Sequence, residues 1–178
     1  MPSYERVLLH GLTVGLAPQR ILEIGTFQGG STLIMCAALD DLNEGQIFCV
    51  DPKPQVAEET WDSIKHRVSI IAEPSPHAVS QAVEMAGRPF DFALIDGDHS
   101  REGVDNDIDA TVSALADEAH IIFHDAHYRE VRDGIDAALS RYSGQFDDAG
   151  LVSRVATADE NGVLWGGLRL LRFRRSEI

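Results

Sequence analysis

Short apolar stretches alternate with segments of helical period along most of the chain, and this alternation limits its fold more than any other feature. Five stretches have the length and residue types of buried strands: Arg20–Ile24, Gln46–Val50, Val68–Ala72, Phe90–Ile95 and His120–His124. Helical patterns separate and follow them, over Gly30–Leu39, Val56–Lys65, Pro76–Ala86, Arg101–Leu115 and Val131–Tyr142. The alternation predicts an α/β fold: a mostly parallel sheet with helices on both faces.

The last part of the chain has a different pattern. Leu151–Thr157 and Leu164–Phe173 have the composition of two strands around a turn at Ala158–Gly162, which predicts a C-terminal antiparallel hairpin and seven strands in all. No repeat, low-complexity tract or flexible linker interrupts the 178 residues, so we expect a single domain over residues 1–178. Ligands of such sheets bind beyond the carboxyl ends of the strands, which makes the residues just after each strand the candidates for chemistry.

Charge and composition limit the kinds of molecule that this protein is expected to bind. The chain has 29 acidic and 15 basic residues, a formal net charge of −14 that repels phosphate backbones and anionic lipids, so we expect a small-molecule substrate and neither nucleic acid nor membrane as partner. No apolar run approaches the about 20 residues that cross a bilayer, and the N-terminus lacks a secretory pattern. Cys36 and Cys49 have no metal-type spacing, and we interpret them as buried free thiols of a cytoplasmic protein.

A glycine turn joins the first predicted strand to the next helix, in the sequence ILEIGTFQGGSTL. Gly25 and Gly29 permit positive φ angles and a close approach of a ligand to the helix N-terminus. A phosphate-binding P-loop needs a lysine where Ser31 stands, and the dinucleotide fingerprint needs a glycine where Phe27 stands. From this segment alone, a loop that only joins strand to helix remains an alternative.

Asp51 ends the second predicted strand, 22 residues beyond Gly29. An acid at this place can accept hydrogen bonds from both ribose hydroxyls of an adenosine ligand. As an alternative, Asp51 followed by Pro52 is a common start of a turn. The glycine turn and the acid together predict an adenosine ligand, and a nicotinamide cofactor remains the main rival because Asp51 would serve either.

Acids and histidines follow two further strands. They are Asp96, Asp98 and His99 after the fourth strand, and His124, Asp125 and His127 after the fifth. Carboxylates and imidazoles that converge at neighbouring strand ends are candidates for metal binding or general-base catalysis. The alternatives are that polar residues simply end the strands, and that Asp98 or Ser100 caps the next helix.

Three aspartates within the following helical pattern, Asp105, Asp107 and Asp109, imitate the start of a calcium-binding loop. The sequence has Ala110 and Ala116 where such a loop needs glycine and glutamate. We therefore interpret the three aspartates as the solvent-facing side of a helix.

The spacing of Glu23, Gly25 and Gly29 resembles the first motif of class I S-adenosylmethionine-dependent methyltransferases, and the resemblance recurs after each later strand. It implies a Rossmann-like seven-stranded sheet. It also implies that the turn Glu23–Ser31 holds the methionine part of the cofactor and that Glu23 organises this pocket, partly through the ligand's amino group. Asp51 would bind the ribose, and Ser75 would lie near the adenine ring or simply cap a helix. The cofactor-binding residues implied are Glu23, Gly25, Thr26, Phe27, Gly29, Ser31, Asp51, Ser75 and Asp96.

Within this class the chain looks like the divalent-metal-dependent O-methyltransferases, the catechol-type group and its macrolide-sugar and cephalosporin-pathway relatives. The resemblance implies a site for Mg²⁺ or another divalent metal at Asp96, His124 and Asp125. His124 departs from the pattern, because the first member of the acidic pair is normally Asp or Glu and Mg²⁺ prefers oxygen ligands. His99, three residues after Asp96, stands where the sugar-modifying relatives have their base.

The expected activity is methyl transfer from S-adenosylmethionine to a hydroxyl of a small molecule, such as a sugar, with His99 as the base. The alternatives are a nicotinamide-dependent oxidoreductase, which must pass a pyrophosphate by Phe27, and a non-catalytic cofactor-binding module. The acceptor pocket is then either open to solvent or completed by the second subunit of a homodimer.

Overall fold

A seven-stranded sheet forms the centre of the protein, and the computed structural model describes residues 1–175 of it. The seven strands of this sheet are β1 (Arg20–Ile24), β2 (Gln46–Val50), β3 (Val68–Ile71), β4 (Phe90–Ile95), β5 (Leu115–Phe123), β6 (Phe146–Ser153) and β9 (Leu168–Arg174). Two short strands, β7 (Thr157–Ala158) and β8 (Leu164–Trp165), pair with each other outside it. The helices are α1 (Ser3–Leu16), α2 (Gly30–Leu42), α3 (Glu58–Ile64), α4 (His77–Ala86), α5 (Arg101–Ala114) and α6 (Arg129–Arg141). None of these helices is both long enough and apolar enough to span a membrane.

The sheet has the order β3-β2-β1-β4-β5-β9-β6. Strands β1 to β5 pair in parallel, and β9 runs antiparallel to both of its neighbours. The chain therefore winds outward from β1 to β3, then returns to the other side of β1 at β4, and the order reverses between these two central strands. This reversal is where open α/β sheets bind ligands. The predicted Rossmann-like, mostly parallel sheet is confirmed.

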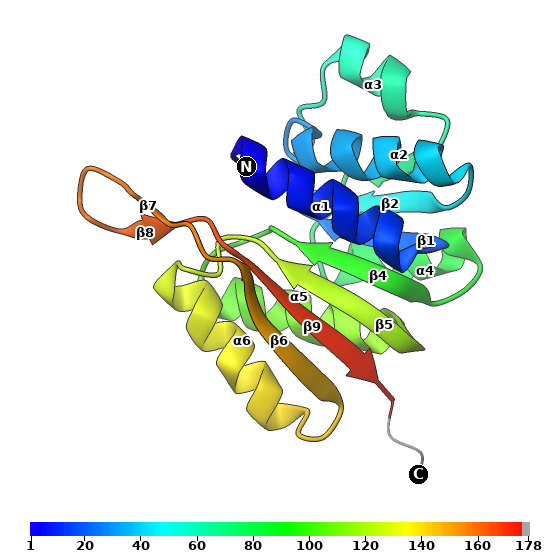
Figure 1. Ribbon diagram of the computed structural model, residues 1–178. Helices are drawn as coiled ribbons and strands as arrows, with labels where there is room; N and C mark the ends of the chain where they lie inside the picture. The colour runs from blue at the N-terminus through cyan, green and yellow to red at the C-terminus, as the bar shows by residue number, and fades with distance from the viewer. Residues whose placement is uncertain (176–178) are drawn as a thin grey trace.

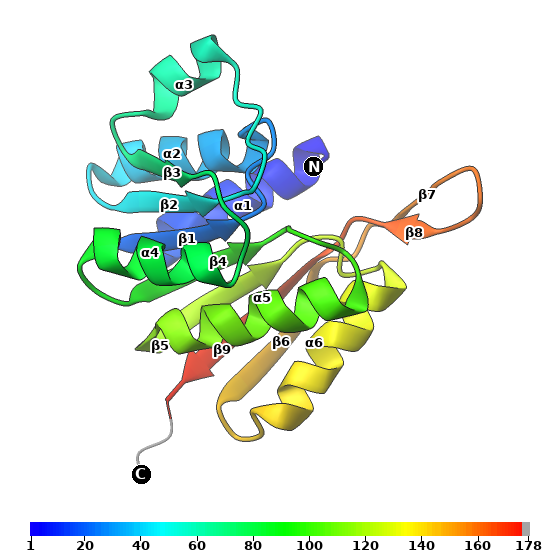
Figure 2. The same cartoon turned by 180° about the vertical axis from the view of Figure 1, so that it is seen from behind.

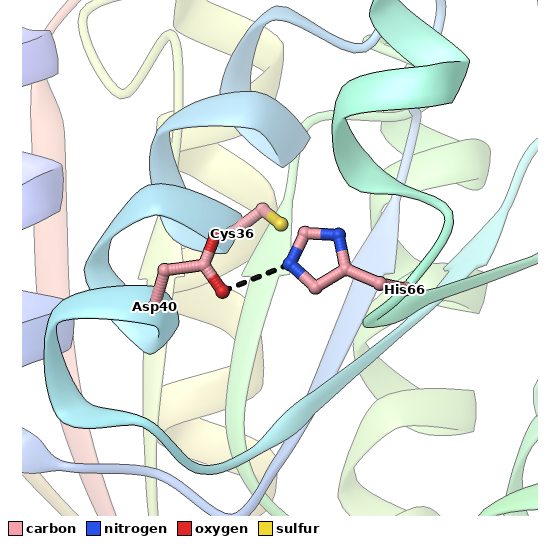
Figure 3. Close-up of side chains that lie close together, drawn as sticks. All are labelled: Cys36, Asp40 and His66. Atoms are coloured by element: carbon pink, nitrogen blue, oxygen red, sulfur yellow. Dashed lines mark hydrogen bonds and ion pairs between the residues drawn. The ribbon is translucent and has the colours of Figure 1, made fainter.

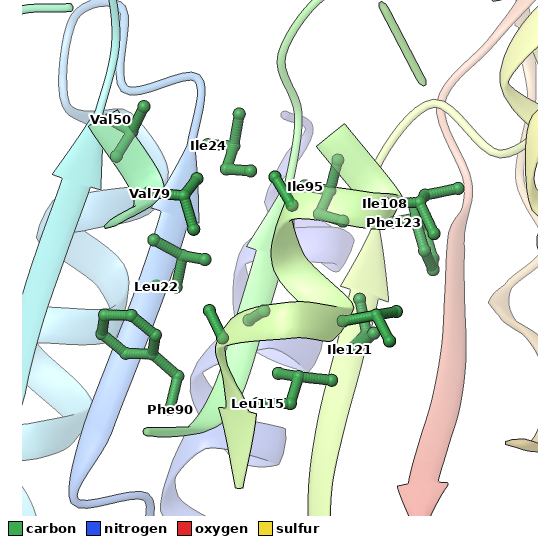
Figure 4. Close-up of a cluster of buried hydrophobic side chains, with 14 of the residues drawn as sticks. Leu22, Ile24, Val50, Val79, Phe90, Ile95, Ile108, Leu115, Ile121 and Phe123 are labelled. Atoms are coloured by element: carbon green, nitrogen blue, oxygen red, sulfur yellow. The ribbon is translucent and has the colours of Figure 1, made fainter. Parts of the chain in front are cut away.

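Helices cover both faces of the sheet. Figure 1 shows α1, α2 and α3 on one face, and Figure 2 shows α4, α5 and α6 on the other. Figure 4 shows the core beneath the second group, where Leu22 and Ile95 from the sheet pack with Val79 and Ile108 from the helices. Because both faces are covered, parallel strands are apolar at nearly every position. Apart from Arg20 at its start, the exception in β1 is Glu23, a fully buried acid at the centre of the sheet.

Two regions before the C-terminal hairpin differ from the sequence-based prediction. Helix α1 lies outside the predicted elements, because Gly11 and Gly15 lower its intrinsic helix propensity and its packing against α2 stabilises it instead. Strand β5 begins at Leu115, a residue that the helical pattern includes in the preceding helix. The register of β5 against β4 shifts near Phe90, which lets this extra length pair with the sheet.

The C-terminal hairpin is present, but it is divided. Strands β6 and β9 form its body inside the main sheet, whereas β7 and β8 form a separate two-stranded ribbon at its tip. Gly166 and Gly167 both have positive φ angles, +84° and +85°, and so they interrupt the extended chain between β8 and β9. The predicted strand Leu164–Phe173 is therefore divided into β8 and β9, and the predicted strand Leu151–Thr157 differs from β6, which begins at Phe146 and ends at Ser153.

Candidate active site

A cavity of about 880 Å³ lies at the carboxyl ends of the central strands, at the reversal of the strand order. Many of the predicted site residues line it: Gly25, Thr26, Phe27, Ser31, Asp51, Ser75, Asp96 and His99. Glu23, Gly29, His124 and Asp125 are not among its lining residues within the described part of the chain. Its volume is within the usual range for pockets that hold small molecules and cofactors.

The glycine turn brings the ends of β1 and β4 together. Gly25 has a φ of +91°, and a Cβ atom there would lie 2.0 Å from the carbonyl oxygen of Asp96. Gly29 has a φ of +79° and is the N-cap of α2. Both positions therefore require glycine for backbone reasons, and at Gly25 the close neighbour is the protein's own backbone.

Asp51 fixes the glycine turn to the end of β2. Its carboxylate accepts hydrogen bonds from the backbone N–H groups of Phe27 and Lys53, each at 2.7 Å. An ionised carboxylate has about four lone-pair directions, so two backbone donors leave room for further donors from a ligand. Asp51 also lines the cavity, which places that remaining capacity where a ribose could use it.

The carboxyl group of Glu23 forms its hydrogen bonds with side chains of the protein itself. Its carboxyl oxygens accept hydrogen bonds from the hydroxyls of Ser31 and Thr32, both at 2.5 Å, and from the Cys49 thiol at 3.1 Å. Burial raises the pKa of this carboxyl above its ordinary value. Because Ser31 itself lines the cavity, Glu23 influences the cavity through the helix N-terminus that it holds in place.

Two hydroxyl groups line the cavity at positions shielded from solvent. By strict hydrogen-bond geometry the oxygens of Thr26 and Ser75 have no partner among the described residues, although the Thr26 hydroxyl faces the Cys49 thiol and the Ser75 hydroxyl faces the Asp107 carboxyl. Both hydroxyls therefore have hydrogen-bonding capacity that a polar ligand in the cavity could use. Ser75 precedes α4 without capping it, since the N-cap residue is Pro76 and that helix has no side-chain cap.

Asp107 also lines the cavity and is only 6% exposed. Its interpretation as a solvent-facing residue is wrong, whereas Asp109 is exposed as expected. The signal was present in the spacing, because Val104, Asp107, Ile108 and Thr111 form the i, i+3, i+4, i+7 stripe of a helix's inner face. Burial raises the pKa of Asp107 to about 6.

The acids and histidines after β4 and β5 converge. His99 Nε2 lies 3.0 Å from Asp125 Oδ2 and 3.6 Å from Asp96 Oδ1. His124 Nδ1 lies 3.2 Å from Asp96 Oδ1 and 3.1 Å from Asp125 Oδ2. The neighbouring residues have structural roles, since Asp98 and Ser100 bond to one another at the start of α5, with Ser100 as the N-cap. His127 turns away and contacts the Arg154 carbonyl.

These contacts control the protonation of the cluster. Hydrogen bonds with Asp125 and Asp96 raise the pKa of His99 to about 9. Burial opposes the charge on His124, but its hydrogen bonds with Asp125 and Asp96 outweigh burial and raise its pKa to about 10. Burial acts in the opposite direction on Asp125 as well, yet the two histidines hold its pKa well below the ordinary range.

Glu5 of α1 belongs to the same cluster and lies outside the predicted site. It is fully buried, and its Oε2 lies 3.1 Å from His124 Nε2. Its other oxygen accepts hydrogen bonds from the Gly167 N–H at 2.7 Å and the Ser153 hydroxyl at 3.1 Å. The sequence signal is the spacing of Glu5, Leu9 and Thr13, the buried stripe of α1. Only the folded chain shows that this stripe ends at the site.

An aromatic pair lies against the candidate base. Tyr128 and Trp165 stack with ring centroids 4.4 Å apart and an interplanar angle of 9°. His99 meets both edge-on, at 6.1 Å from Tyr128 and 5.7 Å from Trp165. Trp165 comes from the small β7–β8 ribbon, so the tip of the C-terminal hairpin reaches the site.

A second group of potential metal ligands lies away from the cavity. Figure 3 shows Cys36 and Asp40 on α2 facing His66, which follows α3. Asp40 is already paired with His66 at 2.9 Å and with the Arg67 guanidinium, which supplies the compensating charge. Burial raises the pKa of the Cys36 thiol to about 11 and disfavours the thiolate that metals bind. This group therefore joins α2 to the segment before β3.

The sheet order, the helices on both faces and the cavity beside β1, β2 and β4 define a class I, Rossmann-like methyltransferase fold. A family model described as a methyltransferase domain matches residues 22–126, more than half of the chain. The chain belongs to this family of methyltransferase-domain proteins. The expected class is thereby confirmed.

Solved structures share the fold along nearly the whole chain. Cofactor-bound Rv0187 from MTB has a TM-score of 0.76 at 20% identity, over 99% of this chain and 82% of that one. The O-methyltransferase TomG from Streptomyces achromogenes, in complex with SAM, has a TM-score of 0.75 at 18% identity, over 98% and 82%. An O-methyltransferase from Bacillus cereus in complex with SAH has a TM-score of 0.68 at 17% identity, over 96% and 81%. No curated protein sequence matches the chain.

Proposed function

We propose that this protein uses S-adenosylmethionine to methylate a hydroxyl group of a small molecule, with His99 as the general base. The observation that carries the proposal is that His99 and Asp96 line the same cavity as Asp51 and the glycine turn. A base is therefore present at one end of a cavity that fits an adenosine ligand at the other. The O-methyltransferases with the same fold, solved with SAM or SAH, support the choice of cofactor.

The residues of the cavity fit this cofactor. Asp51 has acceptor capacity left for ribose hydroxyls, and the hydroxyls of Thr26 and Ser75 have hydrogen-bonding capacity for other polar groups of the cofactor. Arg6 is the one arginine or lysine among the described residues that line the cavity, and we assign it to the cofactor's carboxylate. When bound, S-adenosylmethionine supplies a methyl group that is activated by its positively charged sulfur.

His99 is oriented as a base by the aspartates behind it. Its Nε2–H donates to Asp125, which leaves the Nδ1 lone pair available to accept the proton of an acceptor hydroxyl. The cofactor would supply the methyl group to the acceptor oxygen, and its sulfur would keep the electron pair of the carbon–sulfur bond. The proton ends on His99, where Asp125 stabilises the resulting imidazolium. A positive sulfur nearby favours the neutral imidazole that this step requires.

We propose a sugar or a similar polyhydroxylated compound as the acceptor. The stacked Tyr128 and Trp165 beside His99 offer a flat, amphipathic surface of the kind that packs against the apolar face of a sugar ring. The formal net charge of −14 favours such a neutral small molecule over a nucleic acid.

A nicotinamide cofactor fits less well. Phe27 occupies the turn where a pyrophosphate would pass, with a φ of +46°. Its backbone N–H already donates to Asp51 and so is not available to a phosphate. Both features follow from the same turn that holds Asp51 in the cavity.

Thermal unfolding with S-adenosylhomocysteine, S-adenosylmethionine and NAD tests the cofactor class. A ligand at 100 times its dissociation constant adds about 2.7 kcal/mol of stability, a rise in Tm of about 5–10 °C for a chain of this size. We expect this rise with the two adenosyl ligands and none with NAD. A rise with NAD alone would overturn the proposal.

Methyl transfer itself is tested with S-adenosylmethionine carrying an isotopically labelled methyl group. The protein is incubated with a panel of sugars, phenols and carboxylic acids, and S-adenosylhomocysteine and labelled products are followed by mass spectrometry. We expect label on a hydroxyl oxygen, with sugars as the best acceptors. Label on nitrogen, carbon or carboxylate oxygen would contradict hydroxyl methylation.

A further inference from the structure

One imidazole lies between three carboxylates at the ends of β4 and β5. His124 is 7% exposed, with Glu5 on the side of Nε2 and both Asp96 and Asp125 on the side of Nδ1. An ionised carboxylate only accepts hydrogen bonds, so each ring nitrogen that faces one must donate. The second oxygen of Glu5 accepts from the Gly167 N–H and the Ser153 hydroxyl, which leaves Oε2 for the contact with His124. A doubly protonated ring satisfies the carboxylates on both sides at once, and in that form His124 is a cation.

This arrangement does not fit the metal that the sequence predicts at Asp96, His124 and Asp125. Their donor atoms lie within 4.8 Å of one another, but a metal needs the lone pair of Nδ1, where the structure needs a proton. Both oxygens of Asp125 are also in use. Oδ2 faces His99 and His124, and Oδ1 accepts the Gly166 N–H at 2.6 Å. A Mg²⁺ ion, which demands near-octahedral oxygen ligands, would have to displace these partners.

The cation explains how three buried or half-buried acids coexist. Uncompensated carboxylates in such a place are costly, and the imidazolium supplies a positive charge and two directed hydrogen bonds at once. Unlike a metal ion, the imidazolium of His124 is covalently part of the chain. Through Glu5 it also connects α1 to the site, next to the helix turn from which Arg6 reaches the cavity. Figure 1 shows α1 lying across the sheet with its N-terminal end toward the segment that leads to β7 and β8.

We propose that His124, clamped between Glu5, Asp96 and Asp125, is a built-in cation in the place of a divalent metal, and that this chain methylates its acceptor without a metal. The second half of this proposal rests on the proposed function. The role of His124 is structural and electrostatic: it holds Asp96 and Asp125 in the positions that orient His99.

The clamp is tested on the wild-type protein without any assay of activity. In ¹⁵N-labelled protein at neutral pH, we expect both ring nitrogens of His124 to show attached protons, and the His124→Gln variant identifies their signals. Addition of Mn²⁺, a paramagnetic ion that can occupy oxygen-rich sites of Mg²⁺, should leave these signals sharp in the presence of S-adenosylhomocysteine. An unprotonated ring nitrogen, or broadening by Mn²⁺ that Mg²⁺ reverses, would overturn the clamp.

The His124→Asp variant tests the same idea in the opposite direction. This variant removes the cation and adds a carboxylate, so it should gain a Mn²⁺ site that the wild type and the His124→Gln control lack. Binding is measured as loss of the free Mn²⁺ signal in electron paramagnetic resonance. Equal Mn²⁺ binding by the wild type and His124→Asp would overturn the proposal. If His124→Asp does not fold, the spectra of the wild type decide the matter.

Activity then separates this proposal from the proposed function. Wild-type methyl transfer that is unchanged by a strong chelator supports metal independence, whereas loss on chelation and recovery with Mg²⁺ would overturn it and leave methyl transfer established. If no acceptor is methylated although both His124 protons are seen, the proposed function fails and the clamp stands.

Discussion

His99 Nε2 lies 3.0 Å from Asp125 Oδ2, and this contact, together with a second one to Asp96, raises the pKa of the candidate base to about 9. A base acts only when deprotonated, so kcat/KM should rise about tenfold for each pH unit below this pKa and level off near pH 9. Replacing Asp125 by Asn removes the charge that raises the pKa, and the plateau should then begin at a lower pH with a lower maximum. The pH profiles of the two proteins check this, and identical profiles would show that another group is titrating.

The His99→Ala variant separates catalysis from cofactor binding. The side chain stands at the β4 end of the cavity and touches none of the groups assigned to the ribose. We expect turnover to fall by about 10²–10⁴-fold, the usual contribution of a general base. The affinity for S-adenosylhomocysteine, measured by calorimetry, should stay within about twofold of the wild type. Undiminished turnover would place the base elsewhere.

How much of this site the sequence could predict depended on where each residue lies relative to a strand end. Asp51, Asp96, His99 and Asp125 come directly after parallel strands, and the sheet topology brings those ends together whatever the details of packing. The sequence therefore predicted four residues that the fold brings to the cavity or to the cluster beside it, while their roles remain predictions.

Glu5 shows what such reasoning cannot reach. It lies 119 positions before the histidine that it contacts, on a helix whose place depends on side-chain packing against α2. The prediction for Asp107 was wrong for a different reason. Its two neighbouring aspartates suggested a solvent-facing side of the helix, whereas the apolar stripe around Asp107 places it on the buried side. The tip of the hairpin, with Trp165, is set by the strand break at Gly166 and Gly167, which the alternation of residue types does not reveal.

Asp51→Ala should weaken the binding of adenosyl ligands. The carboxylate both offers acceptors to the ribose and holds the glycine turn through the Phe27 N–H. We expect the Kd for S-adenosylhomocysteine to rise more than tenfold, which corresponds to a loss of about 1.4 kcal/mol or more. Asp51→Asn keeps one acceptor oxygen and should lose less. Calorimetric titration of the three proteins checks the order, and an Asp51→Ala variant with near-normal affinity would remove Asp51 from the ribose site.

Gly25→Ala tests the close approach of β1 and β4. The new methyl group would meet the Asp96 backbone at 2.0 Å while the φ angle of +91° is already unfavourable for alanine. Backbone strain of this kind costs about 1–3 kcal/mol and the clash adds to it. We expect a lower free energy of unfolding in urea. Gly30→Ala is the matched control, because its Cβ would meet nothing within 4 Å, and it should change stability by less than about 0.5 kcal/mol.

Asp107 should make the ligand-free protein less stable as the pH rises. Its pKa is about 6 in the folded chain against an ordinary value of 3.8, so the folded state binds this proton more tightly than the unfolded state does. The contribution of Asp107 to stability is therefore fully present below pH 3.8 and is lost as the pH rises through about 6. Asp107→Asn removes the buried charge, and at pH 8 it should raise the free energy of unfolding by about 1–3 kcal/mol, since one pKa unit corresponds to about 1.36 kcal/mol.

At a pH below 3.8 the same variant should bring no such gain, because Asp107 is then neutral in both states of the wild type. Glu102→Gln, an exposed change in the same helix, is the control and should stay within about 0.5 kcal/mol at either pH. Urea unfolding of the three proteins at both pH values, without ligand, measures the difference. A destabilised Asp107→Asn protein at pH 8 would mean that the ionised carboxylate has a stabilising partner, and the buried acid would then belong to the architecture of the cavity wall.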